Sequence, residues 1–516
     1  MPTLQQLKDK WFIPMDGSAP DGVPCRRHTD DAGQYRLSVS TDGNTVTPLV
    51  DGQAYMKVWH DRLLALMTAP AAEFFNTCWR FEAVKTEGET VSTSDALDDV
   101  EAADGTGTVS TYVLACRNAP LLVYNLPSID WLRLHGAWKS CLDNRFPAAG
   151  SNHQKFAVYK QSATAVSATL GSLDISKPRW DTPAHRPVDP DRHPSFRDKP
   201  THDTGVSLEG PAVTDVEKTY RERWNDSTRT FGLEPPLPPQ PLITSPISAP
   251  AAGGSHSVQV LRTYGITSTF FGYSWSPRGE FTAWASYLNA IKKATSYIYI
   301  EDQYFLPFDW PPCHTRSGLA RDTDIVYQLG EAMKRGVRLA VVVPNNAEDA
   351  LHTRQKFQRD IGVNHLLGIK VAGAAGDIVV AALKSGNTDV YVHSKLMVVD
   401  DELLLIGSVN VCQRSMSHDG ELHVGVVDAN NQLAKEYRKQ LWAEHTGRPA
   451  AVFDDPVAGY GTFKTDTAAS FGHLTPYRVD PAAVYPPGTG TTAPPKGHPT
   501  VLRSLIDPYA GPPALR

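Results

Sequence analysis

The sequence predicts an α/β fold made of two similar α/β sandwich halves, with mixed β-sheets flanked by helices and a pseudo-twofold relation between the halves. Two observations lead to this prediction. Segments with helical periodicity alternate with short apolar, β-branched segments, as in α/β proteins. In addition, one motif occurs twice, nearly half of the 516-residue chain apart. Each copy has a His, a Lys two residues later and a Gly-Ser-x-Asp or Gly-Ser-x-Asn string further on.

The chain is long enough for two large cores. Residues 232–258 are rich in Pro, Gly and Ser, which predicts a linker between the halves. We therefore expect an N-terminal half over 1–240 and a C-terminal half over 259–475. A Pro-rich tail over 476–516 is expected to lie along the surface or to be partly disordered.

The alternation of helices and strands is clearest in the second half. Residues 280–294 and 322–335 have the pattern of helices, and the second of these is expected to stop at Gly336. A short apolar run follows each helix, over 297–300 and 339–343, and each run is expected to form a strand.

The second copy of the motif is predicted to form a β-hairpin. On a strand, His393 and Lys395 point to the same side, because side chains alternate between the two faces. Residues 400–402 are expected to form the turn and 403–406 the return strand. The hairpin then ends beside the His-Lys face, close to the Gly-Ser-x-Asn string.

The first copy follows the same plan. His153 and Lys155 share a face, and 166–170 is the expected return strand, which leads to Gly171. We expect one site built from both halves, in which the two histidines meet.

A pair of histidines and a pair of lysines suits the chemistry of a phosphodiester. One imidazole attacks phosphorus and forms a phosphohistidine, and the other protonates the leaving oxygen and then activates the incoming water or alcohol. Lys155 and Lys395 hold the charged phosphoryl oxygens, with help from Asn410, Ser172 and Ser408. No metal and no cofactor is needed, and none is predicted.

These residues resemble the phospholipase D superfamily, whose signature H-x-K-x4-D occurs twice, each time followed by G-[SG]-x-[ND]. Further segments between residues 152 and 441 resemble its phospholipid-cleaving members. The second copy matches the signature at His393, Lys395, Asp400, Gly407, Ser408 and Asn410, and the flanking similarities lie at 171–185, 208–225, 299–305 and 414–421.

The resemblance implies roles for individual residues. His153 would be the nucleophile and His393 the general acid and base. A carboxylate downstream of each motif would orient a histidine; Glu421 matches this role in the second half, and Asp181 matches it better than Asp174 in the first. The implied catalytic set is His153, Lys155, His393, Lys395, Asp400, Glu421 and Asp181, and the implied substrate-binding set is Ser172, Asp174, Ser408, Asn410 and Gln303.

The first copy departs from the signature at one position. Lys160 occupies the place of the motif Asp. If that Asp has only a local structural role at the turn, its loss is compatible with catalysis. The alternative is that the first half is changing into a non-catalytic state. For Gln303, a polar strand edge is an equally good interpretation.

The resemblance favours a phospholipase D that hydrolyses glycerophospholipids such as phosphatidylcholine to phosphatidic acid and a free headgroup, and that also transfers the phosphatidyl group to alcohols. The alternatives are a phosphodiesterase or nuclease of the same superfamily and a degenerate phospholipid-binding member. A net charge of −6 does not favour binding to nucleic acid. The expected partner is the surface of a phospholipid membrane, bound peripherally, and no stable protein partner is predicted.

The sequence gives limited information on location. The first residues are polar and lack the apolar core of a signal peptide, and no run of about 18 apolar residues occurs. The six cysteines are scattered and indicate neither a zinc site nor a dense disulfide framework. We expect a bacterial protein that is cytoplasmic or exported without a Sec signal, for example as an antibacterial lipase effector, and peripheral at membranes.

Overall fold

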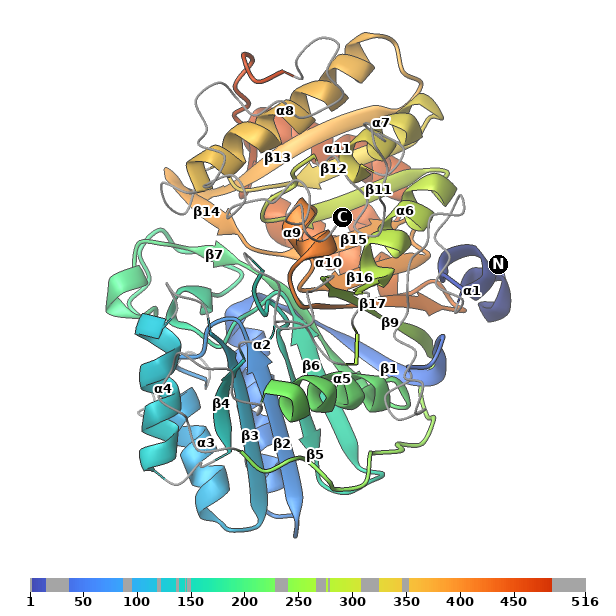
Figure 1. The fold of residues 1–516 in the computed structure, drawn as a ribbon. Coiled ribbons are helices and arrows are strands. Elements are labelled where there is room, and N and C mark those ends of the chain that lie inside the picture. The colour runs from blue at the N-terminus through green and yellow to red at the C-terminus, as the bar shows by residue number, and fades with distance from the viewer. Residues whose placement is uncertain are drawn as a thin grey trace, which may run out of the picture.

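Two mixed β-sheets form the framework of the molecule (Figure 1). The structure is a computed structural model. It describes residues 2–14, 37–86, 95–117, 122–135, 139–143, 145, 150–227, 240–265, 275–276, 279–307, 324–345 and 352–484. The predicted linker is described only from residue 240 onward, and the predicted tail only as far as residue 484.

The N-terminal sheet has the strand order β4-β3-β2-β5-β6-β8-β1. Strands β2, β3 and β4 are parallel, and the remaining pairs are antiparallel. The bounds are β1 Thr41–Val50, β2 Ala72–Cys78, β3 Val109–Cys116, β4 Ser140–Asp143, β5 Phe156–Lys160, β6 Val166–Gly171 and β8 Thr204–Glu209.

The C-terminal sheet repeats this plan in the order β13-β12-β11-β15-β16-β17-β9. Strand β1 also pairs with β9, so the two sheets are joined. The bounds of the C-terminal strands are β9 His256–Tyr264, β11 Tyr297–Asp302, β12 Arg338–Val342, β13 Asp377–Ser385, β15 Lys395–Val399, β16 Leu403–Gly407 and β17 Glu421–Asp428, with short strands β10 Glu280–Phe281, β14 Thr388–Val392 and β18 Leu474–Pro476. The short strand β7 Thr201–His202 belongs to the N-terminal half and pairs with β14.

The matching strand orders confirm the predicted α/β fold with mixed sheets flanked by helices. In each half, three parallel strands are followed by an antiparallel hairpin, β5–β6 or β15–β16, that carries one copy of the motif. Figure 1 shows the N-terminal half, in blue and green, below the C-terminal half, in yellow to red.

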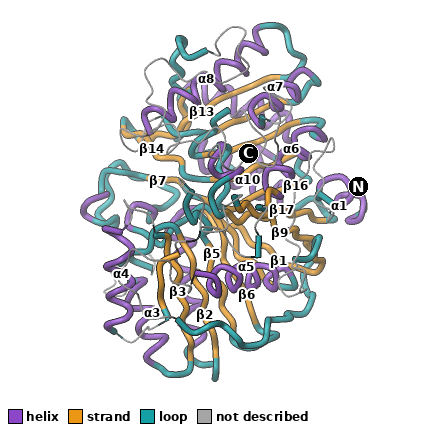
Figure 2. Tube along the Cα trace, viewed as in Figure 1, coloured by secondary structure: helices purple, strands orange, loops and turns teal. Residues whose placement is uncertain are grey.

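Helices cover both sheets (Figure 2). Trp59 of α2 packs in a core on one face of the N-terminal sheet, and Trp284 of α6 packs in a core on one face of the C-terminal sheet. Trp224 of α5 and Trp442 of α10 belong to a third core that contains residues of both sheets. The helices are α1 Leu4–Trp11, α2 Asp51–Leu66, α3 Ala96–Gly105, α4 Leu122–Leu134, α5 Ala212–Ser227, α6 Thr282–Lys293, α7 Ile325–Lys334, α8 His352–Val371, α9 Gln413–Ser417, α10 Leu433–Thr446 and α11 Pro456–Ala469.

The shared core explains why the two halves pack into one molecule: apolar faces of both sheets are removed from water together. Within the described part of the chain, no helix is long and apolar enough to cross a bilayer.

The observed turns and return strands follow the predicted hairpins closely, but both motif histidines lie outside the predicted strands. In the first copy, β5 begins at Phe156, after His153 and Lys155. Strand β14 ends at Val392 and β15 begins at Lys395, so His393 lies between two strands rather than within one. The backbone N–H of His393 donates to the carbonyl of His202, 2.8 Å away in the other half. This contact between the halves replaces a hydrogen bond within the sheet.

Candidate active site

The two histidines of the motif are each joined to the opposite half by a backbone hydrogen bond. The His393 N–H donates to His202 of the N-terminal half, and the His153 N–H donates to the carbonyl of Gly420 in the C-terminal half, both at 2.8 Å. Because both links cross the boundary between the halves, the two motif segments are held against each other. The sequence places these segments far apart, and the fold brings them to one site.

A carboxylate from the opposite half contacts the Nδ1 atom of each histidine. Glu421 Oε1 lies 2.9 Å from Nδ1 of His153, and Asp203 Oδ1 lies 2.8 Å from Nδ1 of His393. Glu421 and Asp203 occupy matching places at the starts of β17 and β8. Because Nδ1 is bound in both rings, Nε2 is the nitrogen that remains for the reaction.

The two motif serines lie behind these carboxylates. Ser408 Oγ donates to Glu421 Oε2, and Ser172 Oγ donates to Asp203 Oδ1, both at 2.5 Å. All four side chains are buried. The serines therefore position the carboxylates, whereas the sequence interpretation gave them contacts to the substrate.

Burial and nearby positive charges both favour the neutral form of the two imidazoles. Burial lowers the pKa of His153 well below its ordinary value, and the ammonium groups of Lys155 and Lys395 lower it further. For His393, burial is again the largest cause, and the guanidinium of Arg179 and the ammonium of Lys395 add to it. A neutral imidazole carries the lone pair that a nucleophile needs.

The lysines lie beside the histidines in both copies. Lys155 Nζ donates to the carbonyl of His153 at 3.0 Å, and Lys395 Nζ donates to the carbonyl of His393 at 2.5 Å. Burial lowers the pKa of Lys395 to about 7, with the Lys155 and Arg179 cations acting in the same direction and the Asp203 carboxylate opposing them. This concentration of positive charge in a buried place favours an anionic ligand.

The carboxylates also respond to burial. Burial raises the pKa of Glu421 to about 8, together with the charge of Asp419. It raises the pKa of Asp203 to about 6, although the Arg179 and Lys395 cations oppose the rise. The negative charge of a bound phosphate would change the pKa values of these groups together, because all of them lie in one poorly hydrated region and interact with each other.

Two buried polar side chains of the C-terminal half, Asn410 and Gln303, have atoms without hydrogen-bond partners in the described chain. Asn410 is fully buried, and neither its Oδ1 nor its Nδ2 has a hydrogen-bond partner within the described residues. Gln303 Nε2 donates to the Tyr391 hydroxyl at 2.9 Å, and its Oε1 is likewise without a partner in the described chain. Buried polar atoms without partners are costly, so these groups are suited to receive substrate oxygens or hydroxyls.

The matching position in the first half is different. Asp174 Oδ1 accepts from the backbone N–H groups of Trp79 and Arg80 at 2.9 and 3.0 Å. It thereby fixes the segment in which the Trp79 ring lies edge-on to His153, with centroids 6.3 Å apart. Asp174 is thus used by the protein itself, and Asn410, its counterpart, is not.

Two members of the predicted catalytic set lie away from the histidines. The Asp400 carboxylate accepts from the backbone N–H groups of Thr295, Ser296 and Tyr297 at 2.8 to 3.0 Å, so it holds the turn against the start of β11. Asp181 contacts His185 and accepts from Arg192 Nε at 3.1 Å. Asp203, which the motif analysis did not select, is the first-half carboxylate that contacts a motif histidine, the role that was expected for Asp181.

Arg179 is the second functional residue that the motif analysis missed. Its side chain is buried, it acts electrostatically on His393 and Lys395, and its guanidinium lies 5.6 Å from the centroid of the Tyr391 ring. The signal was present, because Arg179 lies in the 171–185 segment that carries the family resemblance.

The chain matches known proteins in sequence. Residues 139–320 match a family profile described as "Phospholipase D", and residues 287–444 match one described as "Cardiolipin synthase, PLD-like domain". Phospholipase D gamma 3 of Arabidopsis thaliana is 26% identical over 423 residues, and phospholipase D alpha 1 of Carica papaya is 25% identical over 409 residues. These alignments cover 59% of this chain and 48% and 50% of the relatives, so the chain spans about half the length of the curated relatives it matches.

The fold also matches a solved structure. Phosphatidylserine synthase from Haemophilus influenzae Rd KW20 superposes with a TM-score of 0.50 at 12% sequence identity. The match covers 82% of this chain and 93% of that chain. At this identity the comparison concerns the fold alone, and it includes both halves of the present molecule.

Proposed function

The chain belongs to the phospholipase D superfamily, and we propose that it is a phospholipase D that hydrolyses glycerophospholipids such as phosphatidylcholine through a phosphohistidine intermediate. The observation that carries this proposal is the pair of crossed contacts, His153 with Glu421 and His393 with Asp203. Each contact joins the two halves, and each leaves one Nε2 atom for chemistry.

In the first step, Nε2 of His153 attacks phosphorus, and a P–N bond forms. The P–O bond to the headgroup breaks, and His393 gives its Nε2 proton to the leaving alkoxide, which departs as the free alcohol. The anionic phosphodiester supports this step, because a nearby negative charge favours the protonated form of His393. Lys155, Lys395 and Arg179 neutralise the phosphoryl oxygens in the transition state.

In the second step, the neutral imidazole of His393 accepts a proton from water, and the water oxygen attacks phosphorus. The P–N bond to His153 breaks, and phosphatidic acid is released. An alcohol that replaces water gives a phosphatidyl alcohol by the same transfer of atoms. The carboxylates Glu421 and Asp203 hold the rings through both steps, because each remains bound to Nδ1.

The site is built for turnover rather than for binding alone. The residue that raised the question of degeneracy, Lys160, lies at the end of β5, where its Nζ is 2.9 Å from Glu73 and 3.2 Å from Glu217. Lys160 thus occupies the position of the motif Asp and forms ion pairs with its neighbours in the N-terminal half. The histidine, lysine and carboxylate of the first half are all present around the site.

We further propose that the protein acts at the surface of a phospholipid membrane as a peripheral enzyme. The substrate requires this, because the reacting phosphate of a glycerophospholipid lies at the water interface. Vesicle flotation with phosphatidylcholine liposomes tests the point: the protein should float with the vesicles, and recovery only in the unbound fraction contradicts peripheral binding.

Incubation with phosphatidylcholine vesicles and ethanol tests the proposed reaction. We expect phosphatidic acid and phosphatidylethanol, and neither with His393→Ala. The exposed His135, directly after α4, provides a control, since His135→Ala should keep the activity of the unchanged protein. Cleavage of single-stranded DNA without lipid products would indicate a nuclease of the same superfamily, and vesicle binding without either product would indicate a non-catalytic lipid-binding protein.

A further inference from the structure

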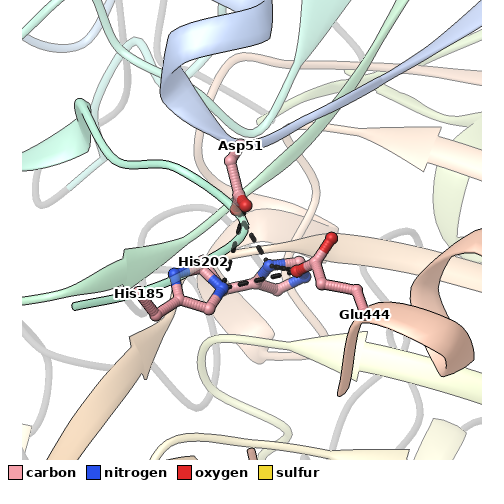
Figure 3. Close-up of side chains that lie close together, drawn as sticks. All are labelled: Asp51, His185, His202 and Glu444. Carbon is pink, nitrogen blue, oxygen red and sulfur yellow. Dashed lines mark hydrogen bonds and ion pairs between the residues drawn. The ribbon is translucent and has the colours of Figure 1, made fainter. Parts of the chain in front are cut away.

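A second group of buried histidines and carboxylates lies apart from the reacting atoms. Asp51, His185, His202 and Glu444 point toward one another (Figure 3), and one ligand atom from each lies within 4.8 Å of the others. Asp51, His185 and His202 come from the N-terminal half, and Glu444 comes from α10 of the C-terminal half. The first three side chains have no exposed surface, and that of Glu444 is 7% exposed.

From this geometry we propose that these four residues form a structural site for a divalent transition metal, with zinc as the ion that fits best. Two imidazole nitrogens and two carboxylate oxygens are ligands that zinc accepts, and four protein ligands with no open position are typical of a structural zinc site. Calcium and magnesium prefer oxygen ligands alone.

The distances support four-coordinate geometry. Nε2 of His185 lies 3.7 Å from Asp51 Oδ2 and 3.3 Å from Glu444 Oε1. Nδ1 of His202 lies 2.9 Å from Asp51 Oδ1 and 3.1 Å from Glu444 Oε1. Ligands that surround zinc tetrahedrally at about 2.0–2.1 Å are about 3.3 Å from each other, so a small adjustment of the side chains completes the site.

The surroundings of the two histidines provide the second argument. The other ring nitrogen of His185 faces Asp181 at 3.3 Å, and that of His202 faces Glu301 at 2.9 Å. Metal-bound histidines characteristically donate their second N–H to a carboxylate, which fixes the tautomer and strengthens the ligand. This arrangement also gives Asp181 a role, since it orients His185 and not a histidine of the reaction.

The third argument is an unsatisfied ligand atom. Asp51 Oδ2 is buried and makes no hydrogen bond within the described residues. A carboxylate oxygen in such a place is expensive unless a cation binds it. The charge of a dication would offset that of the two carboxylate ligands. Because a metal and protons on the ligating ring nitrogens use the same lone pairs, they exclude each other at this site.

The location of the site indicates what the metal does. It joins α10 of the C-terminal half to three segments of the N-terminal half. The carbonyl of His202 accepts the backbone N–H of His393, and the next residue, Asp203, contacts the His393 ring. A metal at His202 therefore fixes the segment that positions His393, without touching the substrate.

The test begins with metal analysis of the full chain, produced without a tag in zinc-supplemented medium and purified without chelator. Inductively coupled plasma mass spectrometry should find about one zinc per chain. Glu444→Gln and His185→Gln should lose that zinc. His60→Gln is the matched control, because His60 is a buried histidine of the same half that contacts a carboxylate, Asp99, at 2.8 Å, and this variant should keep its zinc.

A second measurement decides the question if the ligand variants do not fold. The unchanged protein is stripped with a chelator and titrated with Co²⁺, which should give the intense visible absorption of a tetrahedral site. Its melting temperature should fall on stripping and recover with Zn²⁺, because binding to the folded state alone stabilises it. Purified protein without zinc, together with no Co²⁺ absorption after stripping, overturns the proposal and leaves a proton-held ion-pair network. All these readouts are independent of the lipid reaction.

Discussion

The two halves share a strand order and a His-Lys hairpin, but they differ in how much of each motif is free for the substrate. In the N-terminal half, Asp174 is bound to two backbone N–H groups, whereas its counterpart Asn410 has no partner in the described chain. At the turns, Lys160 is paired with two glutamates and Asp400 with three backbone N–H groups.

The difference separates two kinds of motif residue. Positions that contact or orient the motif histidines have the same chemistry in both halves: a lysine, a carboxylate and the serine that holds the carboxylate. Positions that serve only the local turn differ, because any residue that satisfies its own neighbours is sufficient there. An equivalent position in a repeated motif therefore implies an equivalent role only where both copies face the common site.

The largest expected effect is the loss of either histidine, and it distinguishes the halves. His153→Ala and His393→Ala should each lower kcat by more than about 10³-fold, because one removes the nucleophile and the other the general acid and base. The His393→Ala protein should accumulate phosphoenzyme with lipid substrate, because hydrolysis of the intermediate also needs His393. Intact-mass spectrometry checks this. Phosphoenzyme on His153→Ala, and none on His393→Ala, would reverse the two roles.

The next effect concerns the crossed carboxylates. Asp203→Asn and Glu421→Gln should each lower kcat on the order of 10²-fold with a small change in KM, because the ring loses its orientation while the phosphate-binding cations remain. Asp400→Asn is the matched control, since the Asp400 carboxylate holds the turn to the segment before β11 and contacts neither motif histidine in the described chain. Steady-state kinetics separates the outcomes, and equal losses in all three variants would remove the distinction between positioning and turn residues.

The sequence predicts the hairpins, the histidines and the lysines because all of these are local. It finds Glu421 but misses Asp203, because several aspartates follow the first motif and the sequence does not show which of them faces a histidine. The pairing of β6 with β8 and of β16 with β17 places Asp203 and Glu421 in matching positions. That register exists only in the folded sheets. Asp181 lies in the correct sequence segment but turns toward His185, since the path of the loop depends on tertiary contacts.

The third prediction sharpens the contrast between Asn410 and Asp174. Asn410→Ala should lower kcat/KM about 10-fold with little loss of stability, because it removes donors that the protein itself does not use. Asp174→Ala should destabilise the fold by about 1–3 kcal/mol, because two buried N–H groups lose their acceptor. Chemical denaturation and kinetics together measure both. The proposed contrast is wrong if Asn410→Ala lowers the free energy of unfolding more than Asp174→Ala does.

The smallest expected effect is a shift in the pH dependence of kcat/KM, caused by a change in the pKa of His393 but not in that of His153. Burial is the largest cause of the low pKa of His393, and the charge of Arg179 is the next largest. The pKa of His153 is lowered by burial and by the charges of Lys155 and Lys395. His393 must carry a proton in the first step, so kcat/KM falls as pH rises through its pKa. Arg179→Gln should raise that pKa toward its ordinary value and move the basic limb to higher pH.

The acidic limb of the same profile provides the internal control. It reports the neutral form of His153, and activity is lost there as pH falls through a pKa that lies below the ordinary value for histidine. Arg179→Gln should leave this limb in place, and Arg179→Lys should keep both limbs close to those of the unchanged protein, because the positive charge is retained. The measurement is kcat/KM for phosphatidylcholine across pH at constant ionic strength. Movement of the acidic limb would show that Arg179 acts on more than His393, and an unmoved basic limb would show that it does not lower the pKa of His393.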